Sequence, residues 1–262
     1  MTIIITGTSA GIGFTLAEYF GKKGHKVFGL SRKSVESKYF KTIPTDITDN
    51  TQVQNAIAEV LKTESRIDVL INNAGMGMVG AVEDSTQEEI LKLFNLNLVG
   101  SVQMMTGVLP KMREQKMGQI INISSIGSEM GLPFRGFYSA SKSALDKVTE
   151  AIRYEVSPWN IQVCTLHLGD IKTNIAENRV KTKVSEPYQK TFNKVYSLMN
   201  AHVNDGTEPL EVAEYIDQLL AKKSWKAHFY FGKFGQKIGI PLKWILPQNF
   251  YENLMRKYNQ MD

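Results

Sequence analysis

The sequence predicts an α/β protein in which a parallel, doubly wound sheet of about seven strands carries helices on both faces. Short apolar runs alternate with longer segments of helical periodicity, which is typical of a parallel sheet with crossover helices. The first apolar run ends in a glycine-rich turn that leads straight into a helical segment. Because the 262 residues are 42% hydrophobic and no linker or repeat divides them, we expect one domain over residues 1–262.

The expected elements follow one another in regular order. Strands are expected at residues 2–6, 26–30, 39–43, 67–71, 119–123, 161–166 and 227–231. Helices are expected at residues 12–20 and 209–220, the second with a proline in its first turn. Another helix is expected to follow a cap at Thr48 or Asp49, and a long one to run from capping boxes at Ser85 or Thr86 to about Arg113. A further helix carries Tyr138 and must end before Pro158.

Composition and charge exclude several classes of protein. The single cysteine, Cys164, rules out an internal disulfide and fits a reducing compartment. The four histidines lack the spacing of metal ligands, so we expect no metal. A strand follows Met1 directly and no apolar run approaches the roughly 20 residues of a membrane span, so we expect a soluble, cytoplasmic protein. The net charge of +5 is concentrated in residues 221–262, which carry +6, and nothing indicates nucleic acid as a partner.

Residues 6–13, TGTSAGIG, fill the first turn between a strand and a helix. Glycines there allow a tight turn and a close approach of the backbone to a pyrophosphate, and the helix N-terminus stabilises negative charge. The spacing is GxxxGxG, which differs from the common GxGxxG fingerprint of dinucleotide sites. The turn alone is compatible with an ordinary loop, but its place after the first strand favours a nucleotide site.

Tyr138 and Lys142 form a second candidate site together with Ser125. At positions i and i+4 of a helix their side chains share one face, so the phenol and the ammonium can meet. A nearby cation lowers the phenol pKa of about 10 toward neutral, which allows proton exchange with a carbonyl or an alcohol. The same spacing at Tyr19 and Lys23 is expected to be a surface pair, so the spacing alone is weak evidence.

In combination, these motifs resemble the short-chain dehydrogenase/reductase family, single-domain branch. The matching features are TGTSAGIG, NNAG at 72–75, Asn97, Ser125, Tyr138 and Lys142, and the agreement covers about residues 1–175. The resemblance implies a Rossmann-type fold and hydride transfer between a nicotinamide cofactor and a carbonyl or secondary alcohol. It implies that Tyr138 is the general acid/base, that Lys142 lowers its pKa and binds the nicotinamide ribose, and that Ser125 positions the carbonyl. Asn97 would hold a helix irregularity and a water that relays protons.

The cofactor contacts expected from these arguments, besides Tyr138 and Lys142, are Gly7, Ser9, Ala10, Gly11, Ile12, Gly13, Ser31, Arg32, Asp46, Ile47, Asn73, Ala74, Gly75, Gly169, Ile171 and Thr173. Asp46 is equally compatible with capping a helix. The family usually has Pro-Gly after the sixth strand, where this chain has Leu168-Gly169. His167, just before this pair, is interpreted as a strand-end residue rather than a catalytic one.

The choice of cofactor depends on the end of the second strand. An acidic residue there would bind the NAD ribose, whereas Ser31, Arg32 and Lys33 suit the 2′-phosphate of NADP. We therefore predict NADP. The alternative is that Arg32 and Lys33 are solvated loop charges, and Ala10 occupies the position where such enzymes often carry another basic residue.

Residues 174–209 correspond to the segment that closes over the substrate in this family. An apolar stripe there either faces a lipophilic ligand or packs on the core, and it consists of Tyr188, Phe192, Val195, Tyr196 and Met199. Four more apolar residues flank the catalytic segments and also favour an apolar substrate: Met76, Met130, Phe134 and Phe137. The sequence around Tyr138 resembles that of hydroxysteroid and retinol dehydrogenases, which suggests a lipophilic carbonyl or alcohol substrate.

Residues 232–262 form a basic, aromatic tail beyond the family motifs. We expect it to cover the pocket or to form a subunit interface, and contact with anionic lipid is the less favoured alternative. The family resemblance implies a homodimer or homotetramer that uses the helix from Thr86 and the Tyr138 helix. The alternatives to the predicted function are a reductase of carrier-bound 3-oxoacyl thioesters and a nucleotide-sensing regulator without catalysis.

Overall fold

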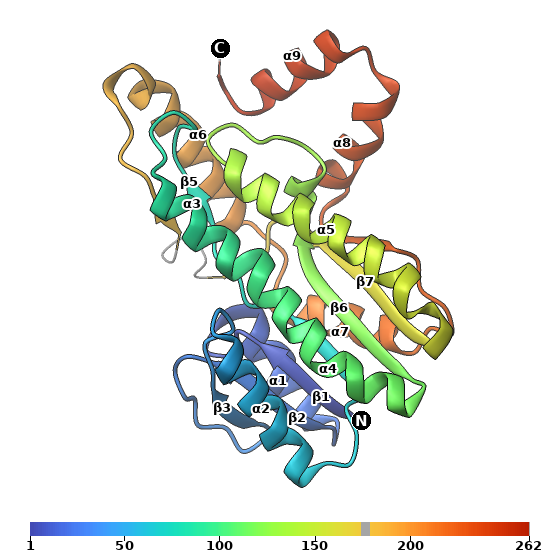
Figure 1. Cartoon of the computed structure of the whole chain (residues 1–262). Coiled ribbons are helices and arrows are strands. Elements are labelled where there is room, and N and C mark those ends of the chain that lie inside the picture. The colour runs from blue at the N-terminus through green and yellow to red at the C-terminus, as the bar shows by residue number, and fades with distance from the viewer. Residues whose placement is uncertain (174–178, 262) are drawn as a thin grey trace.

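A seven-stranded parallel sheet lies at the centre of the computed structural model, which describes residues 1–173 and 179–261 (Figure 1). Its strands are β1 (Thr2–Thr6), β2 (Lys26–Ser31), β3 (Lys41–Pro44), β4 (Val69–Asn72), β6 (Gly118–Ser125), β7 (Ile161–Leu168) and β9 (His228–Phe231). The order across the sheet is β3-β2-β1-β4-β6-β7-β9, so the winding reverses between β1 and β4. Ligands of doubly wound sheets bind at this reversal, outside the carboxyl ends of the strands.

Helices cover both faces of the sheet, as predicted. One face packs on α1 (Gly11–Lys22) and α7 (Pro209–Leu220), and the other on α2 (Asn50–Thr63), α4 (Ser101–Gln115) and α5 (Gly136–Val156). Within β1, Ile4 faces the second group while Ile3 and Ile5 face the first, and all three are fully buried. Because both faces are covered, β1 and β4 contain continuous apolar runs, residues 3–5 and 69–71, instead of alternating with polar residues.

The segment expected to be one long helix from Thr86 is divided into three parts. It comprises α3 (Gln87–Phe94), a π-helix η1 (Asn95–Gly100) and α4. Thr86 forms the predicted capping box with Glu89, whereas the Ser85 hydroxyl donates to the carbonyl of Ala81, so the Ser85 alternative is wrong. The π-helix confirms the irregularity expected around Asn97.

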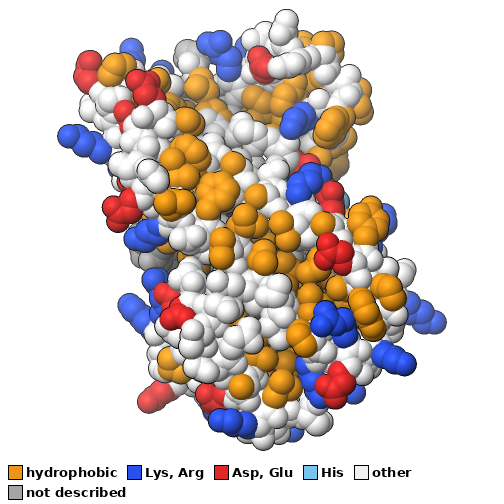
Figure 2. Space-filling view, in the orientation of Figure 1, with side chains coloured by type: hydrophobic (Ala, Val, Ile, Leu, Met, Phe, Trp, Pro, Cys, Tyr) orange, Lys and Arg blue, Asp and Glu red, His pale blue; other side chains and the backbone are white. Residues whose placement is uncertain are grey.

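Several smaller elements surround the carboxyl edge of the sheet. They are β5 (Met78–Val79), β8 (Val180–Lys181), α6 (Glu186–Asn204), α8 (Phe234–Ile245), α9 (Gln248–Tyr258) and the 3-10 turn η2 (Ile126–Ser128). A second 3-10 turn, η3 (Ser157–Trp159), precedes β7 at the opposite edge. The strand β9 was predicted. The tail that follows it, residues 232–262, had no predicted secondary structure, yet it forms α8 and α9. Figure 1 shows α8 and α9 projecting beyond this edge, and Figure 2 shows hydrophobic side chains gathered on that part of the surface. No helix of the described residues is both long and apolar enough to span a bilayer.

Candidate active site

The carboxyl ends of β1, β4, β6 and β7 open into one cavity of about 830 Å³. Every predicted cofactor-binding residue except Gly13 lines it, and so do three of the four predicted catalytic residues, Ser125, Tyr138 and Lys142. Gly13 and Asn97 are instead buried. The sequence motifs, which span positions 7 to 173, therefore meet around a single space.

The glycine-rich turn packs directly against the loop that follows β4. Gly7 has a φ of +74°, and a Cβ atom added there would lie 2.8 Å from the Cα of Ala74. The Asn73 amide donates to the carbonyl of Thr6 at 2.9 Å, and the backbone N–H groups of Asn73 and Ala74 donate to the Thr6 hydroxyl at 3.0 and 2.9 Å. Gly13 has no room for a Cβ beside the Gly7 carbonyl, so its role is to let α1 pack on the turn.

The far end of the cavity carries the residues that were expected to choose the cofactor. The Ser31 side chain is buried and its hydroxyl donates to the carbonyl of Lys33 at 2.7 Å, while Arg32 and Lys33 are exposed and line the cavity. The Asp46 carboxylate accepts from the N–H and hydroxyl of Thr48 at 2.9 and 2.7 Å. Asp46 thus caps the turn before α2 and also lines the cavity, whereas α2 itself is capped by Asp49.

Tyr138 and Lys142 both lie near the start of α5 and line the cavity. The Lys142 ammonium is buried and donates to the carbonyl of Ile123 at 2.8 Å. Burial lowers the pKa of Lys142 to about 8, against the opposing effect of Asp146. Burial also raises the pKa of the Tyr138 phenol, and the Ser125 side chain and the guanidinium groups of Arg135 and Arg179 act in the opposite direction.

The predicted lowering of the Tyr138 pKa is therefore wrong for this state of the protein. Desolvation of the phenolate outweighs the attraction of the nearby cations. Arg135 and Arg179 also line the cavity. Burial thus favours the neutral phenol over the phenolate.

Asn97 links the π-helix to the two segments beside it. Its amide oxygen accepts from the N–H of Met76 at 2.8 Å, and its amide nitrogen donates to the Met76 carbonyl and to the Ser141 hydroxyl, both at 3.0 Å. The side chain is fully buried, whereas that of Asn95 is exposed. Asn97 thus fixes the loop after β4 against α5, one residue before Lys142.

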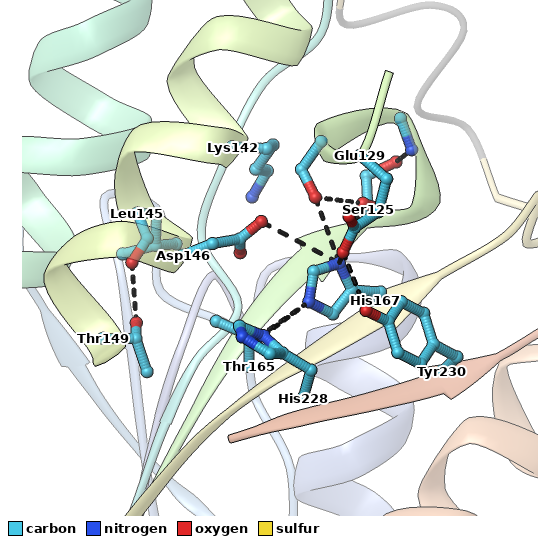
Figure 3. A network of polar contacts seen from close by, with 12 residues as sticks. Ser125, Glu129, Lys142, Leu145, Asp146, Thr149, Thr165, His167, His228 and Tyr230 are labelled. Atoms are coloured by element: carbon cyan, nitrogen blue, oxygen red, sulfur yellow. Dashed lines mark hydrogen bonds and ion pairs between the residues drawn. The ribbon is translucent and has the colours of Figure 1, made fainter. Parts of the chain in front are cut away.

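A buried polar network around His167 lies behind the predicted catalytic residues (Figure 3). The Nδ1 atom of His167 is 3.0 Å from the Ser128 hydroxyl and 3.9 Å from the Asp146 carboxylate, and its Nε2 atom is 2.8 Å from the Thr165 hydroxyl. Burial lowers the pKa of His167 although Asp146 and Glu129 oppose the shift. Sequence reasoning missed this network. The one available signal was that Asp146 follows Lys142 by four residues on the same helix, which places an acid behind the lysine.

The apolar stripe of α6 mostly packs against the protein instead of facing a ligand. Phe192 contacts Phe134 with ring centroids 5.4 Å apart and forms a buried cluster with Val79 and Met199. Of the five stripe residues only Met199 lines the cavity. Residues 174–178 of the expected covering segment lie outside the described residues.

The tail completes the apolar end of the cavity. Side chains of α8 and α9 line it together with Met130 of the loop after β6: Ile238, Leu242, Tyr251, Leu254, Met255 and Tyr258. The Tyr251 side chain is buried, and its hydroxyl lies 3.3 Å from the sulfur of Met130. Of the three interpretations of the tail, covering the pocket is the one that these contacts show. The Leu168-Gly169 departure leaves the strand end in place, because Leu168 pairs with Phe231 and the Gly169 N–H donates to its carbonyl at 2.8 Å.

Comparison with known proteins places this architecture among characterised relatives. A family model described as short chain dehydrogenase matches residues 1–184. The chain is 37% identical over 258 residues to the 3-ketodihydrosphingosine reductase of Bacteroides thetaiotaomicron, covering 97% of this chain and 96% of that protein. It is 32% identical to the NADPH-dependent 3-dehydrocapnine reductase of Ornithobacterium rhinotracheale, covering 86% and 82%. A solved short-chain dehydrogenase from Streptomyces avermitilis superposes with a TM-score of 0.84 at 25% identity, over 99% and 96% of the two chains.

Proposed function

The chain belongs to the short-chain dehydrogenase/reductase family, and on this premise we propose that it reduces a lipophilic ketone with NADPH. One observation carries the proposal. The cavity that holds Tyr138 and Ser125 has a glycine-rich turn at one end and a wall of apolar side chains from α8 and α9 at the other. One end of the cavity therefore suits a polar nucleotide, and the other end suits an apolar ketone.

The residues around the turn fit a dinucleotide. Gly7 and Gly11 have φ values of +74° and +58°, and both line the cavity, so that backbone and not side chain faces the space. Helix α1 begins at Gly11 and its N-cap, Ala10, has no side-chain acceptor for the first N–H groups. Such N–H groups favour a phosphate. The exposed Arg32 and the Ser31–Lys33 turn support NADP over NAD, because a 2′-phosphate needs cations.

When bound, the reduced nicotinamide supplies a hydride to the substrate carbonyl carbon. Tyr138 donates its phenolic proton to the carbonyl oxygen, and the raised pKa keeps that proton in place at neutral pH. Arg135 and Arg179 stabilise the tyrosinate that results. Ser125 donates a hydrogen bond to the carbonyl oxygen and orients it. Lys142 is held at the end of β6 by its bond to Ile123, in reach of the cavity that it lines.

The substrate class follows from the apolar wall and from the relatives. Both named relatives act on a compound whose name gives a ketone at carbon 3. We therefore propose a long-chain ketone, of the 3-ketodihydrosphingosine kind, whose carbonyl meets Tyr138 while the chain extends toward α8 and α9.

The test is a substrate panel in which NADPH oxidation is followed spectrophotometrically. The panel contains long-chain 3-keto amines of increasing chain length, steroids, retinal, sugars and a carrier-bound 3-oxoacyl thioester. The proposal expects kcat/KM to rise with the length of the alkyl chain. Turnover of the thioester alone would support the carrier-bound alternative. Tight NADPH binding without turnover of any ketone would support a nucleotide-sensing regulator.

A further inference from the structure

Helix α8 exposes an apolar stripe that nothing in the described chain covers. Phe234, Ile238, Pro241 and Ile245 follow one another at intervals of four, three and four residues, which places them on one helix face. All four are exposed, and Phe234 and Ile245 retain 76% and 75% of their accessible surface. Trp244, 76% exposed, stands beside this stripe.

Helix α9 repeats the arrangement. Phe250, Leu254 and Tyr258 are spaced by four residues, so they also share one face, and their exposed fractions are 60%, 41% and 52%. Tyr251, one residue after Phe250 and so about 100° from it around the helix, is buried. Each tail helix thus exposes apolar side chains next to residues that line the cavity.

The exposed apolar side chains of the protein are concentrated on these two helices. Of the fifteen large hydrophobic residues exposed in the described parts of the chain, seven lie between Phe234 and Tyr258. Single exposed apolar residues are normal, but a contiguous group marks an interaction surface. In Figure 2 hydrophobic side chains gather at the upper right, where Figure 1 places α8 and α9, with Lys and Arg side chains among them.

The positive charge of the tail favours an anionic partner. Residues 232–262 contain five Lys or Arg and two Asp or Glu, a net charge of +3, whereas residues 1–220 carry −1. An isologous contact between two copies would bring two basic surfaces together. An anionic bilayer offers both an opposite charge and an apolar interior, which is the pairing that interfacial amphipathic helices use.

The exposed stripes are continuous with the mouth of the active-site cavity. Ile238 of α8 and Leu254 and Tyr258 of α9 are each at least 40% exposed, and each also lines the cavity that contains Tyr138. A ligand that left the cavity between these helices would therefore emerge through an apolar surface. If that surface lay on a bilayer, a ligand with a long alkyl chain could pass between cavity and membrane without exposing the chain to water.

We propose that α8 and α9 lie on an anionic lipid surface, with their exposed stripes at the boundary between headgroups and acyl chains. Lys237 and Lys257 face the phosphate layer, and a lipid ketone enters the cavity from the membrane between the two helices. The entry step rests on the proposed function, whereas binding to the membrane does not.

The test is sedimentation of the full-length protein with vesicles. Phosphatidylcholine vesicles containing phosphatidylglycerol are expected to bind the protein, pure phosphatidylcholine vesicles to bind it much less, and added salt to weaken the binding. The variant Phe234→Ser/Trp244→Ser/Ile245→Ser should bind at least tenfold more weakly. A matched control, Val82→Ser/Tyr154→Ser/Leu210→Ser, removes three residues exposed by 62%, 81% and 50% elsewhere and should bind as the wild type does. Thermal melts confirm that both variants fold.

The outcomes separate the two proposals. Equal binding by the tail variant, or no binding to anionic vesicles, overturns the docking surface. So does a tail variant that dissociates an oligomer in light scattering while vesicles bind neither protein, which would assign the surface to a second copy. With a ketone dissolved in water, the tail variant should keep its turnover. Vesicle binding by a wild type that reduces no ketone would leave the docking surface standing and overturn only the proposed function.

Discussion

The Nδ1 atom of His167 lies 3.2 Å from the carbonyl oxygen of Ser125, which joins a fully buried imidazole to the backbone of a predicted catalytic residue. The Ser128 hydroxyl contacts both groups, at 2.7 Å from the carbonyl and 3.0 Å from the imidazole. His167 is thus a positioning residue: it touches the end of β6 from behind, on the side away from the cavity.

Replacing His167 by leucine should therefore lower kcat while leaving NADPH affinity unchanged. Loss of a partner for a buried polar group costs about 1–3 kcal/mol. If all of that cost fell on the transition state, kcat would decrease roughly 5- to 150-fold, which is the largest effect expected. His167→Gln keeps a donor and should restore part of the rate. His228→Leu is a milder test of the same network, because His228 contacts His167 at 3.2 Å as well as Thr165 and Glu150, and so acts on Ser125 only through His167. Equal losses in NADPH affinity and kcat would show that His167 merely supports the fold.

Tyr138→Phe should abolish ketone reduction without weakening NADPH binding, because only the acidic proton is lost. Tyr19→Phe is a matched control, because Tyr19 also precedes a lysine, Lys23, by four residues. The Tyr19 hydroxyl donates to Asp217 at 3.3 Å, so its loss should lower the melting temperature slightly and leave turnover intact. Steady-state kinetics and a fluorescence titration with NADPH check both expectations. Turnover by Tyr138→Phe within tenfold of the wild type would reject Tyr138 as the proton donor.

Arg32→Ala should weaken NADPH binding while leaving NADH binding nearly unchanged, because only NADPH carries the 2′-phosphate. A hydrogen bond to a charged group contributes about 1.5–3 kcal/mol, which corresponds to roughly ten- to hundredfold in Kd. Arg66→Ala removes the same side chain just before β4, at the opposite edge of the sheet, and should change neither affinity. If wild-type protein bound NADH as tightly as NADPH, the cofactor prediction would be wrong.

The fold and the nucleotide end of the site could be predicted because their signals are local. A glycine turn after a strand, a capping box such as that of Thr86, and the spacing of Tyr138 and Lys142 each lie within a few residues. The alternation of strands and helices then fixes which turns meet at the carboxyl edge. The boundaries of the seven strands of the main sheet were consequently predicted to within two residues, whereas the short strands β5 and β8 were not predicted.

What could not be predicted depends on contacts between distant segments. The His167 network joins residues of η2, α5, β7 and β9, and no local pattern indicates that they meet. The direction of the Tyr138 pKa shift depends on how deeply the phenol is buried, which spacing does not reveal. In the tail, the neighbours Phe250 and Tyr251 are both aromatic, yet the first is exposed and the second is buried. Composition alone cannot separate a core face from a docking face.

Asn97→Ala should destabilise the protein because it leaves the N–H of Met76 without its acceptor inside the structure. A buried group left unsatisfied costs about 1–3 kcal/mol, to be measured by denaturant unfolding. Asn95→Ala, in the same π-helix but exposed, should change stability by less than about 0.5 kcal/mol. If Asn97 also holds the predicted proton-relaying water, the Asn97→Ala variant should lose more kcat than its loss of stability explains. Equal stability of the two variants would contradict the structural role of Asn97.

Lys142 gives the cofactor-free protein a specific dependence of stability on pH. Its pKa is about 8 in the folded state and about 10.5 in the unfolded chain. Below pH 8 both states hold the proton and the buried ammonium destabilises the fold by a constant amount. Between these two values the unfolded state binds more protons, so stability rises with pH, by on the order of 3 kcal/mol in all.

The check is the difference in melting temperature between wild type and Lys142→Met, measured from pH 6.5 to 10. Other titrating groups cancel in that difference, so it should stay flat below pH 8 and then shift in favour of the wild type as pH rises. Lys62→Met, on the exposed side of α2, should give a flat difference over the whole range. A flat profile for Lys142→Met would mean that Lys142 titrates alike in both states, and that its ammonium is hydrated instead of buried against Ile123.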